Sequence, residues 1–132
     1  MSNILAYQAL QDISDLLKQT TISGLPLIQF IYDEKTVGLG NDQQESIFLK
    51  VDGEKIDYYL HGDDTFHQAH LSIDIWTRKD LTRLDTLVSG IFDKIKTNAR
   101  FSINSHNYSD LLVIDQHPLS DQYRNIFRHK LD

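Results

Sequence analysis

Two segments of the chain repeat hydrophobic residues at the three- and four-residue spacing of an amphipathic helix. In residues 3–20 the apolar positions fall on one side, and charged residues fall on the other. Residues 80–97 show the clearer stripe, which consists of Leu81, Leu84, Leu87, Val88, Ile91, Phe92 and Ile95. We therefore predict two helices, and we expect a side-chain oxygen of Thr77 or Asp80 to cap the second one.

Short runs rich in β-branched, aromatic and other apolar residues predict strands in the rest of the chain. These runs lie at 27–32, 46–51, 55–60, 67–77, 111–115 and 122–131. Asp52-Gly53 is a two-residue turn signal, so residues 46–60 are expected to form a β-hairpin. In residues 67–77 apolar and polar residues alternate, which is typical of a sheet buried mainly on one side.

Together these elements predict an α+β fold in a single domain that spans residues 1–132. The expected sheet is antiparallel or mixed, with about five to six strands, and two amphipathic helices pack on one face of it. The polar stretch 33–44 is expected to be a loop. The first residues lack a basic region and a long apolar run, so we expect neither a secretory signal nor a transmembrane segment.

Charge is unevenly distributed along an acidic chain. The formal net charge is −6, which argues against a general affinity for nucleic acid through its phosphates. Residues 1–66 carry 4 basic and 11 acidic side chains, a net of −7, whereas residues 67–132 carry 9 and 8, a net of +1. This asymmetry would help like subunits meet head to tail, although ordinary surface variation is the favoured explanation. The absence of cysteine excludes disulfides and thiolate metal sites.

The densest group of metal-ligating side chains is His61, His67 and His70, with Asp63 and Asp64 between them. A three-residue spacing on a strand places His67 and His70 on opposite faces, which works against convergence on a zinc ion about 2 Å from each ligand. The two adjacent aspartates are typical of a turn. We therefore expect no catalytic residue, no cofactor and no metal site. A small metal-dependent enzyme that uses these five residues is the alternative from another class.

Candidate interface residues lie on two of the predicted strands. One face of residues 122–131 carries a mainly basic row, which is Arg124, Ile126, Arg128 and Lys130. A row of like charges is usually a solvated strand face. The alternative is an intersubunit surface complementary to the acidic first half, and the apolar Ile126 within the row keeps that interpretation open. Trp76 falls on the less apolar face of its strand, where it is either a core or edge aromatic or an interface anchor.

The order of these segments is itself informative. A helix, an extended segment and a predicted hairpin precede the strand HLSIDIWTR, which runs directly into the helix DLTRLDTLVSGIFDKI. A late strand, LLVIDQ, and a polar turn follow, and the chain closes on YRNIFRHKLD. This layout, most telling over residues 67–131, resembles the small tail terminator or tail-completion proteins of long-tailed bacteriophages, also called head–tail joining proteins.

The resemblance implies a structural role. Such proteins form a homo-oligomeric ring, usually a hexamer, at the head-proximal end of the tail, where they end growth of the tail tube and join tail to head. The implied partners are the tail tube protein and the head connector or neck protein, and DNA passes through the lumen without specific binding. The resemblance also implies a virion protein that is assembled in the host cytoplasm, without catalysis, cofactor or membrane partner. Another neck or adaptor protein of the virion is the alternative.

Overall fold

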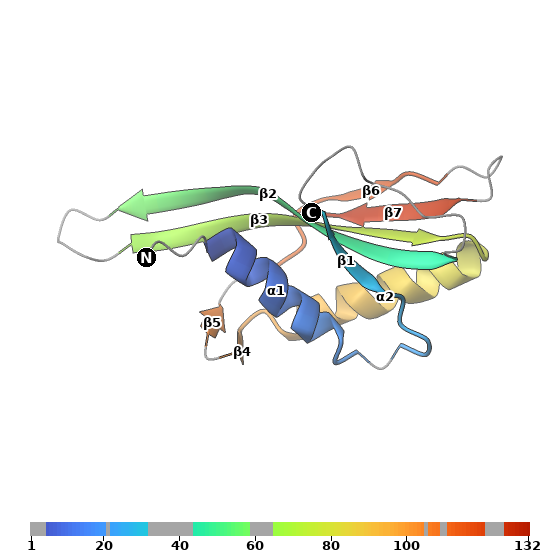
Figure 1. Ribbon diagram of the computed structural model, residues 1–132, viewed down its shortest axis with the longest axis horizontal. Coiled ribbons are helices and arrows are strands. Elements are labelled where there is room, and N and C mark those ends of the chain that lie inside the picture. Colours follow the sequence, from blue (N-terminus) through green and yellow to red (C-terminus); the bar gives the residue numbers. More distant parts are fainter. Residues whose placement is uncertain are drawn as a thin grey trace.

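Two helices and a twisted sheet make up most of the computed structural model (Figure 1). The structure describes residues 5–20, 22–31, 44–58, 65–104, 106–108, 111–120 and 126–132, without the side chains of 5–6, 53–58, 65–69 and 106–107. Helix α1 spans Leu5–Leu17 and helix α2 spans Leu81–Thr97. Asp80 caps α2, because its carboxylate accepts a hydrogen bond of 2.7 Å from the backbone N–H of Arg83. Both predicted helices are confirmed.

The main sheet contains five strands in the order β1-β2-β3-β7-β6. They are β1 Ile28–Ile31, β2 Glu45–Tyr58, β3 Thr65–Thr77, β6 Gln116–Pro118 and β7 Phe127–Leu131. Strand β1 runs parallel to β2, and the other neighbours are antiparallel. Strands β4 Phe101–Ile103 and β5 His106–Tyr108 form a separate antiparallel pair. The predicted α+β class with a mixed sheet is therefore confirmed.

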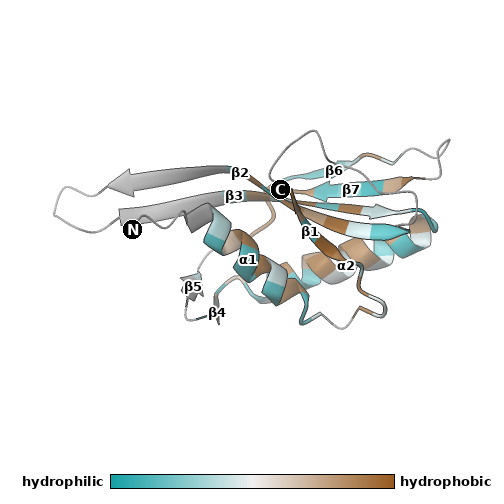
Figure 2. Ribbon diagram, in the orientation of Figure 1, coloured by the Kyte–Doolittle hydropathy of each residue, from teal (hydrophilic) through white to brown (hydrophobic). Residues whose placement is uncertain are grey.

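One face of the sheet, here called the helix-side face, supplies the strands' share of the hydrophobic core. Its central residues are cross-strand partners in the pairs Ile47 with Ile75 and Leu49 with Ile73. They join buried residues of both helices in one cluster, which also contains Leu10, Ile13, Leu16, Leu17, Leu84, Leu87, Ile91, Ile95 and Leu131. Figure 2 shows hydrophobic residues where α1 and α2 approach the sheet. Burial of this apolar surface is the main force that holds the helices and strands together.

The predicted hairpin at Asp52-Gly53 is wrong. Strand β2 continues through this dipeptide, and the register with β3 shifts between Val51 and Gly53. The dipeptide therefore contributes a β-bulge, in which one extra residue is accommodated without reversing the chain. The physical reason is that β3 is long enough to pair with all of β2, so continuing the ladder satisfies more backbone groups than a local turn would.

The carboxyl-terminal third also differs from the prediction. The strand expected at 111–115 is wrong, because these residues form no strand and β6 covers Gln116–Pro118 instead. The strand expected at 122–131 is described only from residue 126, with β7 starting at Phe127. Strands β4 and β5 lie in a part of the chain for which no strand was predicted. These two strands are held by stacking of Phe101 on Tyr108 at 4.7 Å between ring centroids, and Asn104 adopts a positive φ of 52° at their turn. The expected loop at 33–44 lies almost wholly outside the described residues.

Strands β2 and β3 are much longer than their neighbours. Strand β1 pairs with residues 47–50 of β2, and β7 pairs with residues 73–77 of β3. Among the described residues, the segments 53–58 and 65–70 therefore pair only with each other. Figure 1 shows this two-stranded ribbon, which we call the β2–β3 arm, projecting beyond α1. The arm lacks a third strand on either edge within the described part of the chain.

Candidate functional site

The sheet face opposite the core, here called the outer face, carries a layer of aromatic and charged side chains. Arg128 donates hydrogen bonds to both carboxylate oxygens of Asp74, from Nε at 2.9 Å and from Nη2 at 2.6 Å. The guanidinium also lies 4.5 Å from the ring centroid of Trp76. Trp76 in turn meets Phe48 edge to face, with ring centroids 5.8 Å apart. These contacts join β2, β3 and β7 through side chains as well as through backbone hydrogen bonds.

This layer changes the interpretation of the predicted interface residues. Arg128 and Trp76 are brought together, but the charge of Arg128 is already paired within the chain. Lys130 lies beside Asp74 in the strand register and forms an ion pair of 3.6 Å with Asp132. Ile126 is half-buried, and Arg124 lies outside the described residues. Arg128, one member of the basic row, therefore stabilises the fold through contacts within the chain. The role of the row as a contact surface stays a prediction.

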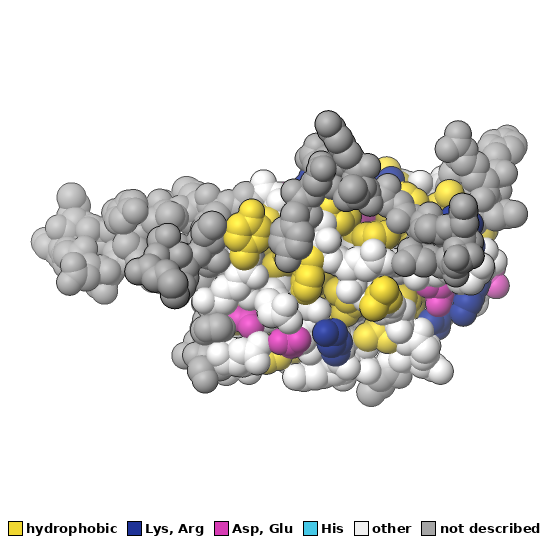
Figure 3. Space-filling model, viewed as in Figure 1, with side chains coloured by type: hydrophobic (Ala, Val, Ile, Leu, Met, Phe, Trp, Pro, Cys, Tyr) yellow, Lys and Arg dark blue, Asp and Glu magenta, His cyan; other side chains and the backbone are white. Residues whose placement is uncertain are grey.

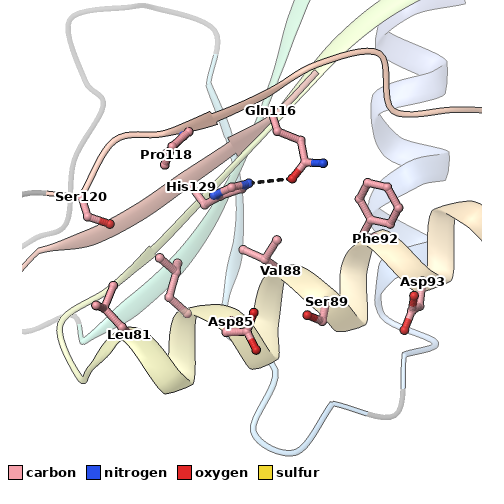
Figure 4. A pocket seen from close by; sticks show the side chains of 11 residues that line it. Leu81, Asp85, Val88, Ser89, Phe92, Asp93, Gln116, Pro118, Ser120 and His129 are labelled. Atoms are coloured by element: carbon pink, nitrogen blue, oxygen red, sulfur yellow. Dashed lines mark hydrogen bonds between the residues drawn. The ribbon is translucent and has the colours of Figure 1, made fainter.

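A groove of about 630 Å³ runs between α2 and the sheet edge formed by β6 and β7. In Figure 4, Val88 and Phe92 point from α2 toward the strands, while Gln116 and His129 point toward α2. The last two residues are joined by a 3.0 Å hydrogen bond between His129 Nε2 and Gln116 Oε1. Burial lowers the pKa of His129, although the nearby charge of Asp74 acts in the opposite direction. The imidazole is therefore neutral over a wider pH range than a solvated histidine.

The groove combines an apolar floor with acidic side chains on α2. Asp85 and Asp93 line it and are exposed, and Leu81, with half of its surface exposed, lies at one end. Such a slot fits apolar side chains of another molecule. The sequence pattern alone does not reveal this groove, because an apolar stripe at helical spacing is typical of a helix face that packs on a core. The available signal was the width of that stripe, since Val88 and Phe92 broaden it beyond the buried positions Leu84, Leu87, Ile91 and Ile95.

The start of α2 is tied to the sheet by a separate ion pair. Arg83 donates to Glu45 from Nε at 2.8 Å and to the backbone oxygen of Gly24 from Nη2 at 2.7 Å. Burial raises the pKa of the Glu45 carboxyl, but hydrogen bonds from Arg83, Thr77 and Lys79 outweigh that effect and lower it. Figure 3 shows acidic and basic side chains side by side at this end of the molecule. These hydrogen bonds hold the start of α2 against β2 and against the segment before β1.

The histidine and aspartate group of the sequence analysis is only partly described. His61, Asp63 and Asp64 lie outside the described residues, and so does the side chain of His67. His70 is exposed on β3. The expectation that this group binds no metal and performs no catalysis therefore stays a prediction.

No described helix combines the length and the apolar character that crossing a lipid bilayer requires. A scan against protein-family models finds no match for the chain, and a search of curated proteins finds no match either.

Proposed function

We propose that this chain is a structural subunit of a bacteriophage tail that forms a closed ring of about six copies at the head-proximal end. The ring ends growth of the tail tube and joins the tail to the head. The segment order of the sequence suggests this role, and the α+β fold is compatible with it. The partners are further copies of the chain, the tail tube protein and the head connector, and the place of action is the virion.

The β2–β3 arm is the observation that carries the proposal. A two-stranded ribbon is marginal by itself in water, because it has little apolar surface to bury and leaves backbone groups unpaired on both edges. Here 53–58 and 65–70 form such a ribbon, and no other described strand pairs with them. An extension of this kind gains stability when a neighbouring subunit covers it or adds a strand to its edge. It therefore suits a chain whose working form is an assembly.

The charge of the chain is compatible with a ring around DNA. The formal net charge is −6, so phosphate groups would be repelled on average and passing DNA would not be held by counterion release. The first half of the chain is acidic and the second half is nearly neutral. This difference favours head-to-tail contacts between like subunits over contacts in which two identical faces meet.

The proposal is tested by the mass and shape of the assembly. We expect size-exclusion chromatography with light scattering to give a mass several times that of one chain, either alone or after addition of purified tail tubes. Negative-stain images should show extra density at one end of each tube. A monomer at every concentration that also fails to bind tubes would overturn the proposal.

A shortened arm provides the matched variant. Residues 54–69 are replaced by Asn-Gly, a two-residue turn that joins the register partners Gly53 and His70. The core residues whose burial the structure describes lie outside the deleted segment, so we expect cooperative unfolding to be retained. Loss of assembly with retained folding supports the arm as the contact, and unchanged assembly contradicts it.

A coding position directly before the major tail tube gene would favour the terminator over another adaptor.

A further inference from the structure

A second cluster of metal-ligating side chains lies at the β6 edge of the sheet, and its members alternate in sequence with the groove residues Gln116 and Pro118. His117 Nε2 lies 3.0 Å from Asp132 Oδ2 and 3.3 Å from Asp115 Oδ2. Ligand atoms of the three residues all lie within 4.8 Å of one another. Local sequence spacing does not reveal this set, because Asp132 lies 15 residues after His117.

We propose that Asp115, His117 and Asp132 form a binding site for one divalent metal ion, for which Zn²⁺ is the best chemical fit. Strand geometry positions the three ligands. Asp115 directly precedes β6 and His117 lies within it, and in extended backbone side chains two residues apart point to the same side. Asp132 stands opposite Asp115, because the backbone N–H of Asp132 donates to the carbonyl of Asp115 at 3.0 Å.

The distances match the spacing that a metal ion imposes. Zinc bonds of about 2.1 Å at tetrahedral angles place neighbouring ligand atoms about 3.4 Å apart. The two separations from His117 Nε2, 3.0 and 3.3 Å, are close to that value. One imidazole nitrogen faces two carboxylate oxygens here, whereas a single N–H can direct a good hydrogen bond to only one of them. A cation between the three atoms satisfies all of them at once.

Electrostatics favour the same assignment. Like charges directly opposite on neighbouring strands destabilise a sheet, and Asp115 and Asp132 are such a pair. Asp132 Oδ1 is buried without a hydrogen-bond partner, and Lys130 Nζ reaches it only at an ion-pair distance of 3.6 Å. A divalent ion would neutralise both carboxylates and fasten the edge strand β6 to the end of β7. One nitrogen and two oxygen ligands favour Zn²⁺ over Mg²⁺ or Ca²⁺, which prefer oxygen alone.

The site is tested by titration of the full chain without a histidine tag, after removal of metal with a chelator. We expect isothermal titration calorimetry at about pH 7 to show one Zn²⁺ bound per chain through this site. His117→Ala and Asp115→Asn should each weaken that binding at least tenfold, since each removes a ligand. Asp115 is the safer variant for folding, because its side chain is 61% exposed. Zn²⁺ should also raise the unfolding temperature of the unmodified chain and not that of His117→Ala.

His70→Ala is the matched control, because His70 is exposed on β3 and outside the cluster. Its zinc affinity should equal that of the unmodified chain. Unchanged affinity in both His117→Ala and Asp115→Asn, provided that circular dichroism shows them folded, would overturn the proposal. So would an equal loss in His70→Ala, or Ca²⁺ binding as tight as that of Zn²⁺. This inference does not rest on the role in the phage tail, since ring formation and zinc binding are measured separately.

Discussion

Arg128 and Asp74 form a two-pronged ion pair between β7 and β3, on the sheet face away from the core. The shortest contact joins Arg128 Nη2 to Asp74 Oδ2 at 2.6 Å, and the Asp74 side chain is only 10% exposed. Their Cα atoms are not direct partners, because Asp74 stands opposite Lys130 and Arg128 stands opposite Trp76. The long arginine side chain therefore reaches diagonally across the ladder, over the indole ring.

The first prediction concerns this pair. Arg128→Ala leaves the carboxylate of Asp74 largely buried without its main partner, so we expect the free energy of unfolding to fall by about 2–3 kcal/mol. Urea unfolding followed by circular dichroism measures the change. Arg128→Lys keeps the charge but loses the two-pronged geometry and the planar stacking, and it should recover only part of the loss.

Lys130→Ala serves as the control for the pair. Lys130 lies on the same strand and the same face, but its ion pair with Asp132 is longer and more exposed. We expect a change below about 0.5 kcal/mol. If Arg128→Ala were as mild as Lys130→Ala, the outer-face ion pair would contribute nothing measurable to stability.

The second prediction separates the core from the groove on α2. Leu84 is 7% exposed and belongs to the core cluster, so Leu84→Ala should lower the free energy of unfolding by about 2–4 kcal/mol. Phe92 is only partly buried and lines the groove, so Phe92→Ala should destabilise the fold by less than about 2 kcal/mol. Chemical unfolding measures the free energy of unfolding of both variants. An equal loss of stability in Leu84→Ala and Phe92→Ala would place Phe92 in the core.

The third prediction concerns close packing at Gly90. A Cβ added there would lie 2.6 Å from both Cγ1 and Cδ1 of Ile22, which is too close for a real contact. Overpacking of this kind costs about 1–3 kcal/mol, so Gly90→Ala should lower stability by up to about 2 kcal/mol after the helix-propensity gain of about 1 kcal/mol is subtracted. Alanine otherwise gains about 1 kcal/mol over glycine inside a helix, so the sign of the change reports the contact.

A double-mutant cycle identifies Ile22 as the cause. Ile22→Ala removes both clashing atoms, so in that background Gly90→Ala should become neutral or stabilising. Thermal or urea unfolding of the four proteins gives the coupling energy. A penalty for Gly90→Ala that persists in the Ile22→Ala background would mean that another neighbour restricts the helix at this point.

The fourth prediction is a pH dependence that arises from Glu45. Its carboxyl is more acidic in the folded chain than the ordinary value of 4.5, because the hydrogen bonds from Arg83, Thr77 and Lys79 outweigh burial and lower the pKa. A group with a lowered folded pKa contributes stability that is present above the unfolded pKa and lost as pH falls through the folded pKa. We therefore expect stability to decline on acidification below about pH 4.5.

Glu45→Gln provides the comparison for that measurement. It keeps the shape of the side chain but removes the titrating carboxyl, so its stability should depend less on pH between about 5 and 3. Urea midpoints at several pH values measure the difference between the two proteins. Parallel curves would show that Glu45 does not contribute to acid sensitivity.

The local hydrophobic pattern determined both helices and the faces of β3. In α2, four residues of the predicted stripe are buried, namely Leu84, Leu87, Ile91 and Ile95, and Asp80 provides the expected cap. On β3, Ile73 and Ile75 face the core, whereas Asp74 and Trp76 lie on the outer face. These features follow from sequence because side-chain direction repeats with the backbone geometry of each element. An apolar stripe at helical spacing, or an apolar–polar alternation along a strand, therefore indicates which side is buried.

Only the tertiary structure decided which segments pair with one another. The bulge at Asp52-Gly53, the parallel pairing of β1 and the diagonal ion pair of Arg128 with Asp74 all depend on which strand lies alongside. The three-residue cluster at the sheet edge depends on it as well, because β6 and β7 bring Asp132 beside His117. Such contacts join residues far apart in sequence, and no local pattern encodes a partner that the chain reaches only on folding.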